Sequence, residues 1–250
     1  MSQVKNRRRG VLVTGASRGI GRALCEELLK RGFEVHGLVR KQDQAPPGVQ
    51  AHVGDIRDRT TVKALMRELA PKIDCYIANA GVGAVLNPSK EDTADKAADI
   101  MDINGTATIY SVYALSYEWI QLGNSKGKKI GVVSSLAAGM SMPKNAVYSA
   151  SKSAQLITCE GLDYDLARNG IGVSVIQPGF IETEMSADIK QRPFLISAAD
   201  AARRICVGME RGQFRIAFPA GTDWLAWSYH ITPRFLLRWA IRWLEKRGLV

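Results

Sequence analysis

The segment NAVYSASKSA (145–154) places a tyrosine and a lysine, Tyr148 and Lys152, four positions apart among small residues. Residues i and i+4 share one face of a helix, so we expect the phenol and the ammonium to point the same way. A positive charge beside a phenol lowers its pKa from about 10 and prepares it to exchange a proton with a carbonyl or alcohol oxygen. Because Y-x-x-x-K often arises by chance, this interpretation needs support from other residues.

Polar residues at two other places could complete such a site. Ser134 and Ser135 end an apolar run (129–135), and Asn104 lies in the middle of a predicted helix over 91–121. Serines at the carboxyl end of a parallel strand would lie at the edge where α/β sheets bind ligands. An amide deep in a helix either hydrogen-bonds a neighbouring carbonyl or holds a water molecule in a proton path, and the sequence leaves both readings open.

A glycine-rich turn, VTGASRGIG, follows the first apolar run. Gly15, Gly19 and Gly21 lie between a predicted strand (10–16) and a predicted helix (19–31). Glycine permits the tight turn and the close approach of the backbone to a pyrophosphate, while the helix N-terminus presents amides and a positive dipole end. The strand–turn–helix context therefore predicts a dinucleotide site.

The end of the second predicted strand (34–39) discriminates between the two nicotinamide cofactors. An NAD site carries an acidic residue there to hold the ribose hydroxyls, but this chain has Arg40 and Lys41. Arg18, in the glycine turn, is predicted to point into the same region. Guanidinium groups without a carboxylate suit a 2′-phosphate, so we predict NADP(H). The alternative is that Arg40 and Lys41 form a solvated surface turn.

Short runs that are mostly β-branched alternate with longer helical stretches. The predicted strands are 10–16, 34–39, 49–55, 74–81, 129–135, 172–179 and 214–218, and the predicted helices are 19–31, 59–70, 91–121, 147–168 and 198–211. Strands without polar alternation are buried on both faces. The pattern predicts an α/β fold, a Rossmann-type doubly wound parallel sheet of about seven strands with helices on both faces. We expect one catalytic domain over 1–222, with a basic arm at 1–9, followed by an extension over 223–250.

Seven ordered motifs carry a family resemblance: TGASRGIG, GDIRD, NAG, MDING, VVSS, YSASK and QPGFIETEM. Over about residues 8–220 the chain resembles the single-domain short-chain dehydrogenases/reductases. The resemblance implies an oxidoreductase in which Asn104, Ser135, Tyr148 and Lys152 form a catalytic tetrad. In that scheme Tyr148 is the general acid or base, Ser135 orients the substrate oxygen, Lys152 lowers the tyrosine pKa and holds the nicotinamide ribose, and Asn104 keeps a relay water.

The resemblance also implies the residues that bind the cofactor. Asp55 and Ile56 are assigned to the adenine, and the segment that begins at Pro178 is assigned to the nicotinamide amide and the pyrophosphate. With the glycine turn, the predicted cofactor residues are Gly15, Ser17, Arg18, Gly19, Ile20, Gly21, Arg40, Asp55, Ile56, Asn79, Ala80, Gly81, Tyr148, Lys152, Pro178, Gly179, Ile181 and Thr183. The three histidines match no metal-ligand spacing, so no metal site is expected.

Two loops beyond the strand ends, 136–147 and 181–197, are expected to set the specificity. Their apolar residues, Met140, Met142, Met185, Phe194 and Leu195, favour a hydrophobic ketone, alcohol or acyl-chain carbonyl, unless they only pack the loops. One alternative is a 3-oxoacyl thioester reductase of lipid metabolism, with Lys144 and Arg168 as docking residues for an acidic carrier protein. The other is a non-catalytic NADP-binding sensor or scaffold.

The extension from residue 223 contains four of the five tryptophans. In a helix that begins at Arg234, cationic residues recur every fourth position at Arg234, Arg238, Arg242 and Lys246, and apolar residues cover the remainder. This pattern suits the surface plane of a membrane, and it suits burial against another subunit or over the active site equally well.

The bulk composition narrows the remaining function classes. The net charge is +10, but no nucleic-acid recognition motif appears and the basic residues are spread out, so we expect no nucleic-acid partner. The four cysteines are scattered, which argues against a metal cluster or a disulfide framework. The N-terminus lacks a secretory signal and no apolar run is long enough for a membrane span, so we expect a cytoplasmic protein, with segment 234–246 as a candidate for peripheral membrane contact. The family resemblance implies a homo-oligomer, either a dimer or a tetramer.

Overall fold

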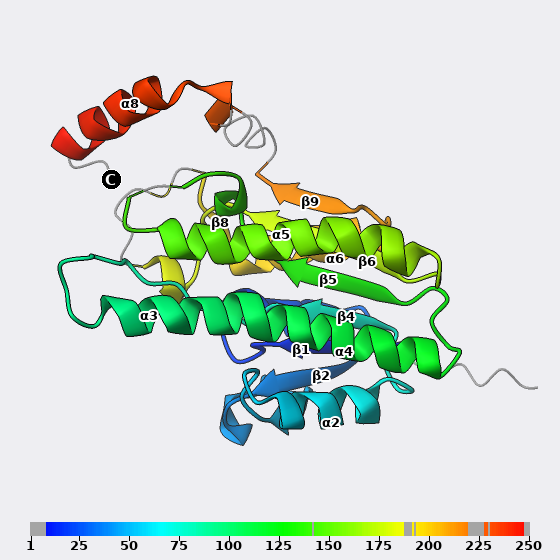
Figure 1. Cartoon of the computed structure of the whole chain (residues 1–250). Coiled ribbons are helices and arrows are strands. Elements are labelled where there is room, and N and C mark those ends of the chain that lie inside the picture. Colours follow the sequence, from blue (N-terminus) through cyan, green and yellow to red (C-terminus); the bar gives the residue numbers. More distant parts are fainter. Residues whose placement is uncertain are drawn as a thin grey trace, which may run out of the picture.

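Seven parallel strands form the central sheet of the computed structural model, which describes residues 9–141, 143–187, 192, 194–219, 228–229 and 231–247. The strands lie in the spatial order β3–β2–β1–β4–β5–β6–β9, and every neighbouring pair is parallel (Figure 1). Their bounds are β1 Gly10–Thr14, β2 Glu34–Val39, β3 Gln50–Val53, β4 Cys75–Ala78, β5 Lys129–Val133, β6 Gly172–Pro178 and β9 Arg215–Phe218. The predicted doubly wound sheet is confirmed.

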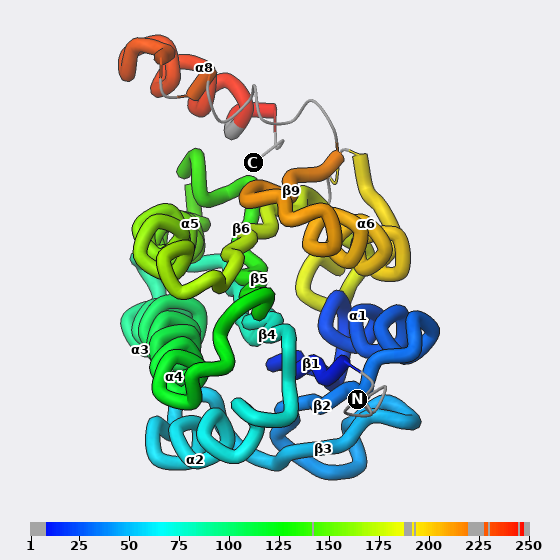
Figure 2. Tube along the Cα trace, turned by 90° about the vertical axis from the view of Figure 1, so that its right-hand side faces the viewer, coloured from blue at the N-terminus to red at the C-terminus, as the bar shows by residue number. Residues whose placement is uncertain are grey.

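Helices cover both faces of the sheet. Figure 2 shows α1 (Gly19–Lys30) and α6 (Ala198–Glu210) on one side, with α2 (Arg59–Leu69), α4 (Thr108–Gln121) and α5 (Ala146–Ala167) on the other. Alternate residues of a strand point to opposite faces, so Leu12 enters one hydrophobic core while Val11 and Val13 enter the other. Burial on both faces explains why these strands contain no polar alternation.

The sheet has a switch point between β1 and β4. The chain moves outward from β1 to β2 and β3, then returns to β4 and moves outward in the opposite direction through β5, β6 and β9. Ligands of open α/β sheets bind at the carboxyl ends of the strands where the order reverses. The glycine turn follows β1 and Asn79 follows β4, so the fold brings both to that crevice.

The predicted helix over 91–121 is not uniform. It consists of α3 (Thr93–Ile100), a π-helical segment η2 (Met101–Ala107) and α4. A π-helical segment widens the helix, and such segments are common at functional sites. The sequence does not predict this segment, because its residues are compatible with an ordinary α-helix. Asn104 lies at its centre.

Two short strands frame the predicted specificity loop. β7 (Ile181–Glu182) pairs with β8 (Ile196–Ser197), and a 3₁₀ turn, η4 (Glu184–Ser186), lies between them. Three more elements complete the described chain: the 3₁₀ turns η1 (Gln42–Gln44) and η3 (Leu136–Gly139), and the helix α8 (Arg234–Lys246). None of the helices in the described ranges is long and apolar enough to cross a bilayer. Most of the basic arm and the start of the C-terminal extension lie outside those ranges, and the division into domains stays a prediction.

Candidate active site

Hydrogen bonds from Asn79, which follows β4, hold the glycine turn after β1 in place. The Asn79 Nδ2 donates to the carbonyl oxygens of Thr14 (3.0 Å) and Gly15 (3.2 Å), and the Thr14 Oγ1 accepts the Asn79 amide at 3.0 Å. Gly15 has φ +65°, which favours glycine, and a Cβ added to Gly21 would lie 2.1 Å from the Gly15 carbonyl oxygen. The turn therefore keeps the N-terminus of α1 open toward the pocket, where a pyrophosphate would meet backbone amides.

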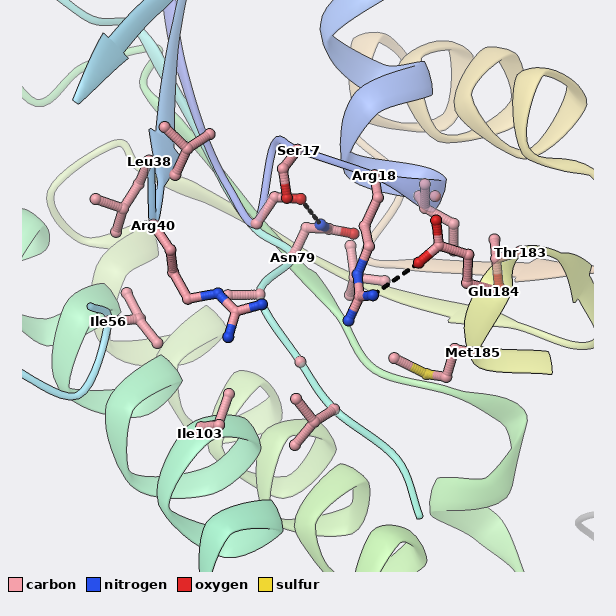
Figure 3. Close-up of a pocket in the computed structure, with 18 of the residues that line it drawn as sticks. Ser17, Arg18, Leu38, Arg40, Ile56, Asn79, Ile103, Thr183, Glu184 and Met185 are labelled. Carbon is pink, nitrogen blue, oxygen red and sulfur yellow. Dashed lines mark hydrogen bonds and ion pairs between the residues drawn. The ribbon is translucent and has the colours of Figure 1, made fainter. Parts of the chain in front are cut away.

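The far end of the same pocket is cationic. Arg40, which follows β2, lines this end together with Asp55 and Arg57 (Figure 3 labels Arg40). The Arg57 guanidinium donates to Asp55 Oδ2 at 2.7 Å, and this hydrogen bond holds the pKa of the Asp55 carboxyl below its usual range. Arg57 therefore offsets the charge of an acidic group in the same part of the pocket as Arg40. Arg57 was not predicted as a site residue, although its position two residues after Asp55 within GDIRD could have indicated it. Lys41 was predicted at this end but is not among the lining residues.

An ion pair lies at the mouth of the pocket. The Arg18 Nη1 is 2.7 Å from the Glu184 Oε2, and Figure 3 shows the two side chains reaching toward each other from the glycine turn and from η4. Both side chains are exposed, with 57% and 71% of their surface accessible, so the bond is screened by solvent. In this structure Arg18 is therefore engaged by a carboxylate that sequence analysis did not single out.

The two serines at the end of β5 have different contacts. The Ser134 hydroxyl donates to the main-chain oxygen of Lys152 at 2.8 Å and so anchors α5 to the sheet. The Ser135 hydroxyl accepts the Ala137 amide at 3.1 Å and also hydrogen-bonds the Tyr148 side chain. Burial raises the pKa of the Tyr148 phenol, and the hydrogen bond from Ser135 acts in the lowering direction with a smaller effect. Ser135 is thus the serine that faces the phenol.

Lys152 lies on the same face of α5 as Tyr148, but its ammonium turns toward the sheet. The Lys152 Nζ donates to the Val133 carbonyl at 2.8 Å and to the Gln155 Oε1 at 3.2 Å. Burial lowers the pKa of Lys152 to about 7 because desolvation disfavours its charged form. Burial is also the largest influence on the pKa of Tyr148, which it raises. The expectation that Lys152 lowers the Tyr148 pKa stays a prediction.

Asn104 has the structural contacts that the sequence analysis left open. Its Nδ2 donates to the Val82 carbonyl (2.8 Å) and to the Ser151 Oγ (3.1 Å), and its Oδ1 accepts the Val82 amide at 2.8 Å. The side chain is fully buried and ties the segment after β4 to α5. Its main-chain oxygen accepts a bond from the Gln155 Nε2 at 2.7 Å.

Most of the predicted cofactor residues line one pocket. These are Gly15, Ser17, Arg18, Gly19, Ile20, Arg40, Asp55, Ile56, Asn79, Ala80, Gly81, Tyr148, Lys152 and Thr183. Gly21, Pro178, Gly179 and Ile181 are outside its lining: Gly21 packs behind the glycine turn, Pro178 ends β6 and Ile181 is buried in β7. Asn104 and Ser135 also lie outside the lining, but they contact Val82 and Tyr148, which belong to it.

The apolar side of the site faces the tyrosine. A Cβ added to Gly83 would lie 3.5 Å from the Met185 Sδ and 3.7 Å from the Tyr148 Cδ2, so the thioether and the phenol ring border the same small space. Phe194 and Leu195 are exposed nearby along the chain, Met140 is half-buried, and Met142 lies outside the described residues. Among the described residues, no group of three or more His, Cys, Asp or Glu side chains could hold a metal ion.

A glycine turn at a switch point, joined in one pocket to a tyrosine and lysine on a helix, defines a nucleotide-dependent oxidoreductase of the α/β class. The family model for short chain dehydrogenases matches residues 9–193. The chain therefore belongs to the short-chain dehydrogenase family.

Known members of the family span most of this chain. A 3-oxoacyl-(acyl-carrier-protein) reductase FabG from Salmonella typhimurium is 30% identical, over 77% of this chain and 82% of its own length. An 11-beta-hydroxysteroid dehydrogenase-like protein, 4A, from Arabidopsis thaliana is 29% identical over 91% of this chain and 82% of its own. A short chain dehydrogenase from Burkholderia cenocepacia, solved in complex with NADP, superposes with a TM-score of 0.82 at 28% identity, covering 94% of this chain and 98% of that one.

Proposed function

We propose that the protein is an NADP(H)-dependent oxidoreductase that interconverts a hydrophobic ketone and the corresponding secondary alcohol. The observation that carries the proposal is one pocket that is lined by the Tyr148 phenol and the buried Lys152 at one end and by Arg40 at the other. The Burkholderia relative bound to NADP supports the cofactor, since its chain shares this fold over nearly its whole length.

The residues present fit an NADP-type dinucleotide. The open N-terminus of α1 and the glycine turn would receive the pyrophosphate, because a Cβ at Gly15 or Gly21 would collide with backbone atoms of the turn and its neighbours. Arg40 would bind a 2′-phosphate with a planar fork of donors. The Asp55 carboxylate, which would repel that phosphate, is already paired with Arg57.

The chain's own residues supply the proton and the positioning. When bound, the cofactor supplies or accepts the hydride. In the reducing direction the Tyr148 phenol donates its proton to the substrate oxygen, and its raised pKa keeps it protonated at neutral pH. The Ser135 hydroxyl donates a hydrogen bond to the same oxygen and stabilises the charge that develops there. Lys152 in its charged form favours the phenolate left behind and would hold the nicotinamide ribose.

Apolar groups beside Tyr148 favour a hydrophobic substrate. Met185 borders the phenol, and Phe194 and Leu195 expose apolar surface in the same loop. The name of the Arabidopsis relative refers to a hydroxysteroid, and the name of FabG refers to a 3-oxoacyl chain on a carrier protein. Steroids and acyl chains are both largely apolar, which agrees with the apolar residues beside Tyr148.

The thioester alternative has weaker support from the basic residues. Arg168 follows the C-terminus of α5, whereas Tyr148 lies in its first turn, so about 30 Å of helix separates them. Of the two predicted docking residues, only Lys144 is close in sequence to the catalytic turn. We therefore place a simple hydrophobic ketone before a carrier-bound substrate.

A substrate panel tests the proposal. The purified chain, with NADPH or NADH, is assayed by cofactor absorbance against hydrophobic ketones, a 3-oxoacyl thioester and a hydrophilic ketose, with Tyr148→Phe as the inactive control. NADPH oxidation by apolar ketones supports the proposal, and activity confined to the thioester favours the acyl reductase. If NADPH binds but no carbonyl is reduced, the protein is a non-catalytic NADP-binding protein and the proposal fails.

A further inference from the structure

A buried glutamine connects two parts of the catalytic site. Gln155 lies on α5 one turn after Lys152 and is 1% exposed. A buried amide is costly unless its hydrogen bonds are made. Both ends of this amide are used: the Oε1 accepts from the Lys152 Nζ at 3.2 Å, and the Nε2 donates to the Asn104 main-chain oxygen at 2.7 Å.

The contact is made possible by the π-helical segment. Asn104 lies at the centre of η2, and its side chain already binds Val82 and Ser151, so its main-chain oxygen is the group that meets Gln155. Residues 104 and 155 are 51 positions apart and are joined because η2 packs against α5. In the family resemblance a water molecule relays protons from Asn104, whereas here a side chain reaches the main-chain oxygen of that residue.

The bridge also orients the lysine. An ammonium carries three N–H bonds, and two of them are directed to the Val133 carbonyl and the Gln155 amide oxygen. Lys152 lines the cofactor pocket, and its Nζ lies 3.5 Å from the position that a Cβ on Gly81 would occupy. Two N–H bonds of the ammonium are used by these acceptors, so the third is available to a group bound in the pocket.

We propose that Gln155 is a positioning residue of the active site, whose amide joins the Lys152 ammonium to the Asn104 carbonyl and aims the remaining N–H at the cofactor. This inference rests on the proposed function for its effect on turnover. The bridge also favours the charged lysine, because the amide oxygen accepts from an ammonium and so offsets part of its burial. The other polar groups on the elements packed around Lys152 are uncharged: the Val133 carbonyl of β5, Ser134 and Ser135 after that strand, Asn104 of η2, and the protonated phenol of Tyr148.

Two substitutions at Gln155 should shift the titration of Lys152 in opposite directions. Gln155→Met keeps the length of the side chain and removes both hydrogen bonds, so the Lys152 titration should move to lower pH. Gln155→Glu places a carboxylate at the same position, so the Lys152 titration should move to higher pH. Carbon NMR of the lysine ε-carbons, with Lys152→Met for assignment, measures both. Cys159→Ala, one turn further along α5 and equally buried, is the matched control and should leave the titration unchanged.

Turnover gives a second readout. Gln155→Met should lower kcat about tenfold, shift the kcat–pH profile in the direction of the NMR titration, and leave the KM for NADPH within about twofold. An unchanged NMR titration in both Gln155 variants, with folded protein by thermal unfolding, overturns the inference. If the wild type binds NADPH without turnover, the proposed function fails, and the NMR titration still decides the role of Gln155.

A separate observation concerns the outer face of α8. Phe235, Leu236, Trp239 and Trp243 are exposed there, with 69% and 68% of the Phe235 and Trp239 surfaces accessible. The residues of the opposite side, Leu237, Ala240, Ile241 and Leu244, are half-buried. Figures 1 and 2 both show α8 beyond the β9 edge of the sheet.

Cationic side chains border this apolar face. Arg238, Arg242 and Lys246 are exposed along one flank, and the Arg247 guanidinium lies 4.1 Å from the centre of the Trp243 ring. In the sequence, residues 234–247 contain five basic residues and one acidic residue. A second copy of α8 would bring like charges together, whereas an anionic lipid surface complements both the charge and the aromatic face. At 13 residues the helix is about 20 Å long, which is too short to cross a bilayer.

We infer that the outer face of α8 docks on an anionic phospholipid surface. The full chain should float with phosphatidylcholine vesicles that contain phosphatidylglycerol and should float poorly with pure phosphatidylcholine vesicles or in high salt. The double variant Trp239→Ser/Trp243→Ser should reduce the bound fraction about tenfold, while Val53→Ser, an exposed apolar residue on β3, should not. Absence of flotation overturns the inference, and loss of a dimer in the double variant would instead assign this face to a second copy.

Discussion

The ammonium nitrogen of Lys152 lies 5.7 Å from the centre of the Tyr148 ring, on the same face of α5. The two groups are close but are not in direct contact, since the nitrogen donates to Val133 and Gln155. Burial dominates both groups, lowering the pKa of the lysine and raising that of the tyrosine. Before a cofactor enters, the site therefore holds a protonated phenol beside a lysine that is about half charged at neutral pH.

The pKa of Lys152, about 7, predicts a pH dependence of stability. Between pH 7 and the unfolded value near 10.5, the unfolded chain binds a proton at this lysine that the folded chain does not, so stability rises with pH. Below pH 7 Lys152 is charged in both the folded and the unfolded chain, so the folded state carries the full free-energy cost of burying that charge. Relative to Lys152→Met, the wild type should gain up to about 1.4 kcal/mol per pH unit in this window. Denaturant unfolding at several pH values measures the difference, and a pH-independent difference would contradict it; the exposed Lys63→Met is the control.

Removal of the Tyr148 hydroxyl should abolish catalysis without abolishing cofactor binding. Tyr148→Phe keeps the ring that lines the pocket and removes the group that exchanges the proton. The expected result is a decrease in kcat of about 10² to 10⁴, with NADPH affinity within a few fold of the wild type. Steady-state kinetics and fluorescence titration measure the two quantities, and Tyr113→Phe on the surface of α4 is the matched control. Retained activity would exclude Tyr148 as the proton donor.

Charge reversal at Arg40 should exchange the cofactor preference. Arg40→Asp replaces the proposed phosphate donor with the acidic residue that suits two ribose hydroxyls. NADPH binding should weaken by about tenfold to hundredfold, while NADH binding is kept or improved. Fluorescence titration with both cofactors is the measurement, and Lys41→Asp, next in sequence but outside the pocket lining, is the comparison. Equal weakening by both substitutions would mean that only the net charge matters.

We expect Glu184 to compete with the cofactor for Arg18, because the two side chains form an ion pair at 2.7 Å. Because the ion pair is exposed, its removal frees the guanidinium at a small energetic cost. Glu184→Gln should therefore tighten NADPH binding about two- to fivefold, with most of the gain at low salt. Glu182→Gln, an exposed acidic residue on β7, is the control for a general change in charge. Weaker binding in Glu184→Gln would show that the pair instead closes over the cofactor.

The homo-oligomer stays a prediction, and the outer surface of α4 and α5 is where we expect it. Tyr113, Tyr117, Ile157 and Tyr164 are all more than half exposed on these two helices, which Figure 1 shows side by side. Patches of exposed apolar residues commonly mark interfaces. Ile157→Glu should convert the oligomer to a monomer, which sedimentation velocity measures. A wild-type chain that sediments as a monomer would contradict the prediction.

The types and spacing of neighbouring residues were sufficient to predict the sheet and part of the candidate site. The apolar runs without polar alternation predicted strands buried on both faces, and the glycine spacing predicted the turn after β1. Both features depend on interactions within a few residues. The four-residue spacing of Tyr148 and Lys152 likewise predicted a shared helix face, as α5 shows. These features follow from backbone geometry that neighbouring residues dictate.

Long-range packing decided the rest. The bond between Gln155 and Asn104 joins positions 51 apart, and that between Arg18 and Glu184 joins positions 166 apart. No local pattern encodes which of these polar groups meet, because their partners depend on how η2 docks on α5 and how η4 docks on the glycine turn. The protonation state of Lys152 was decided in the same way: the sequence placed it near Tyr148, but the degree of burial in the folded chain controls its charge.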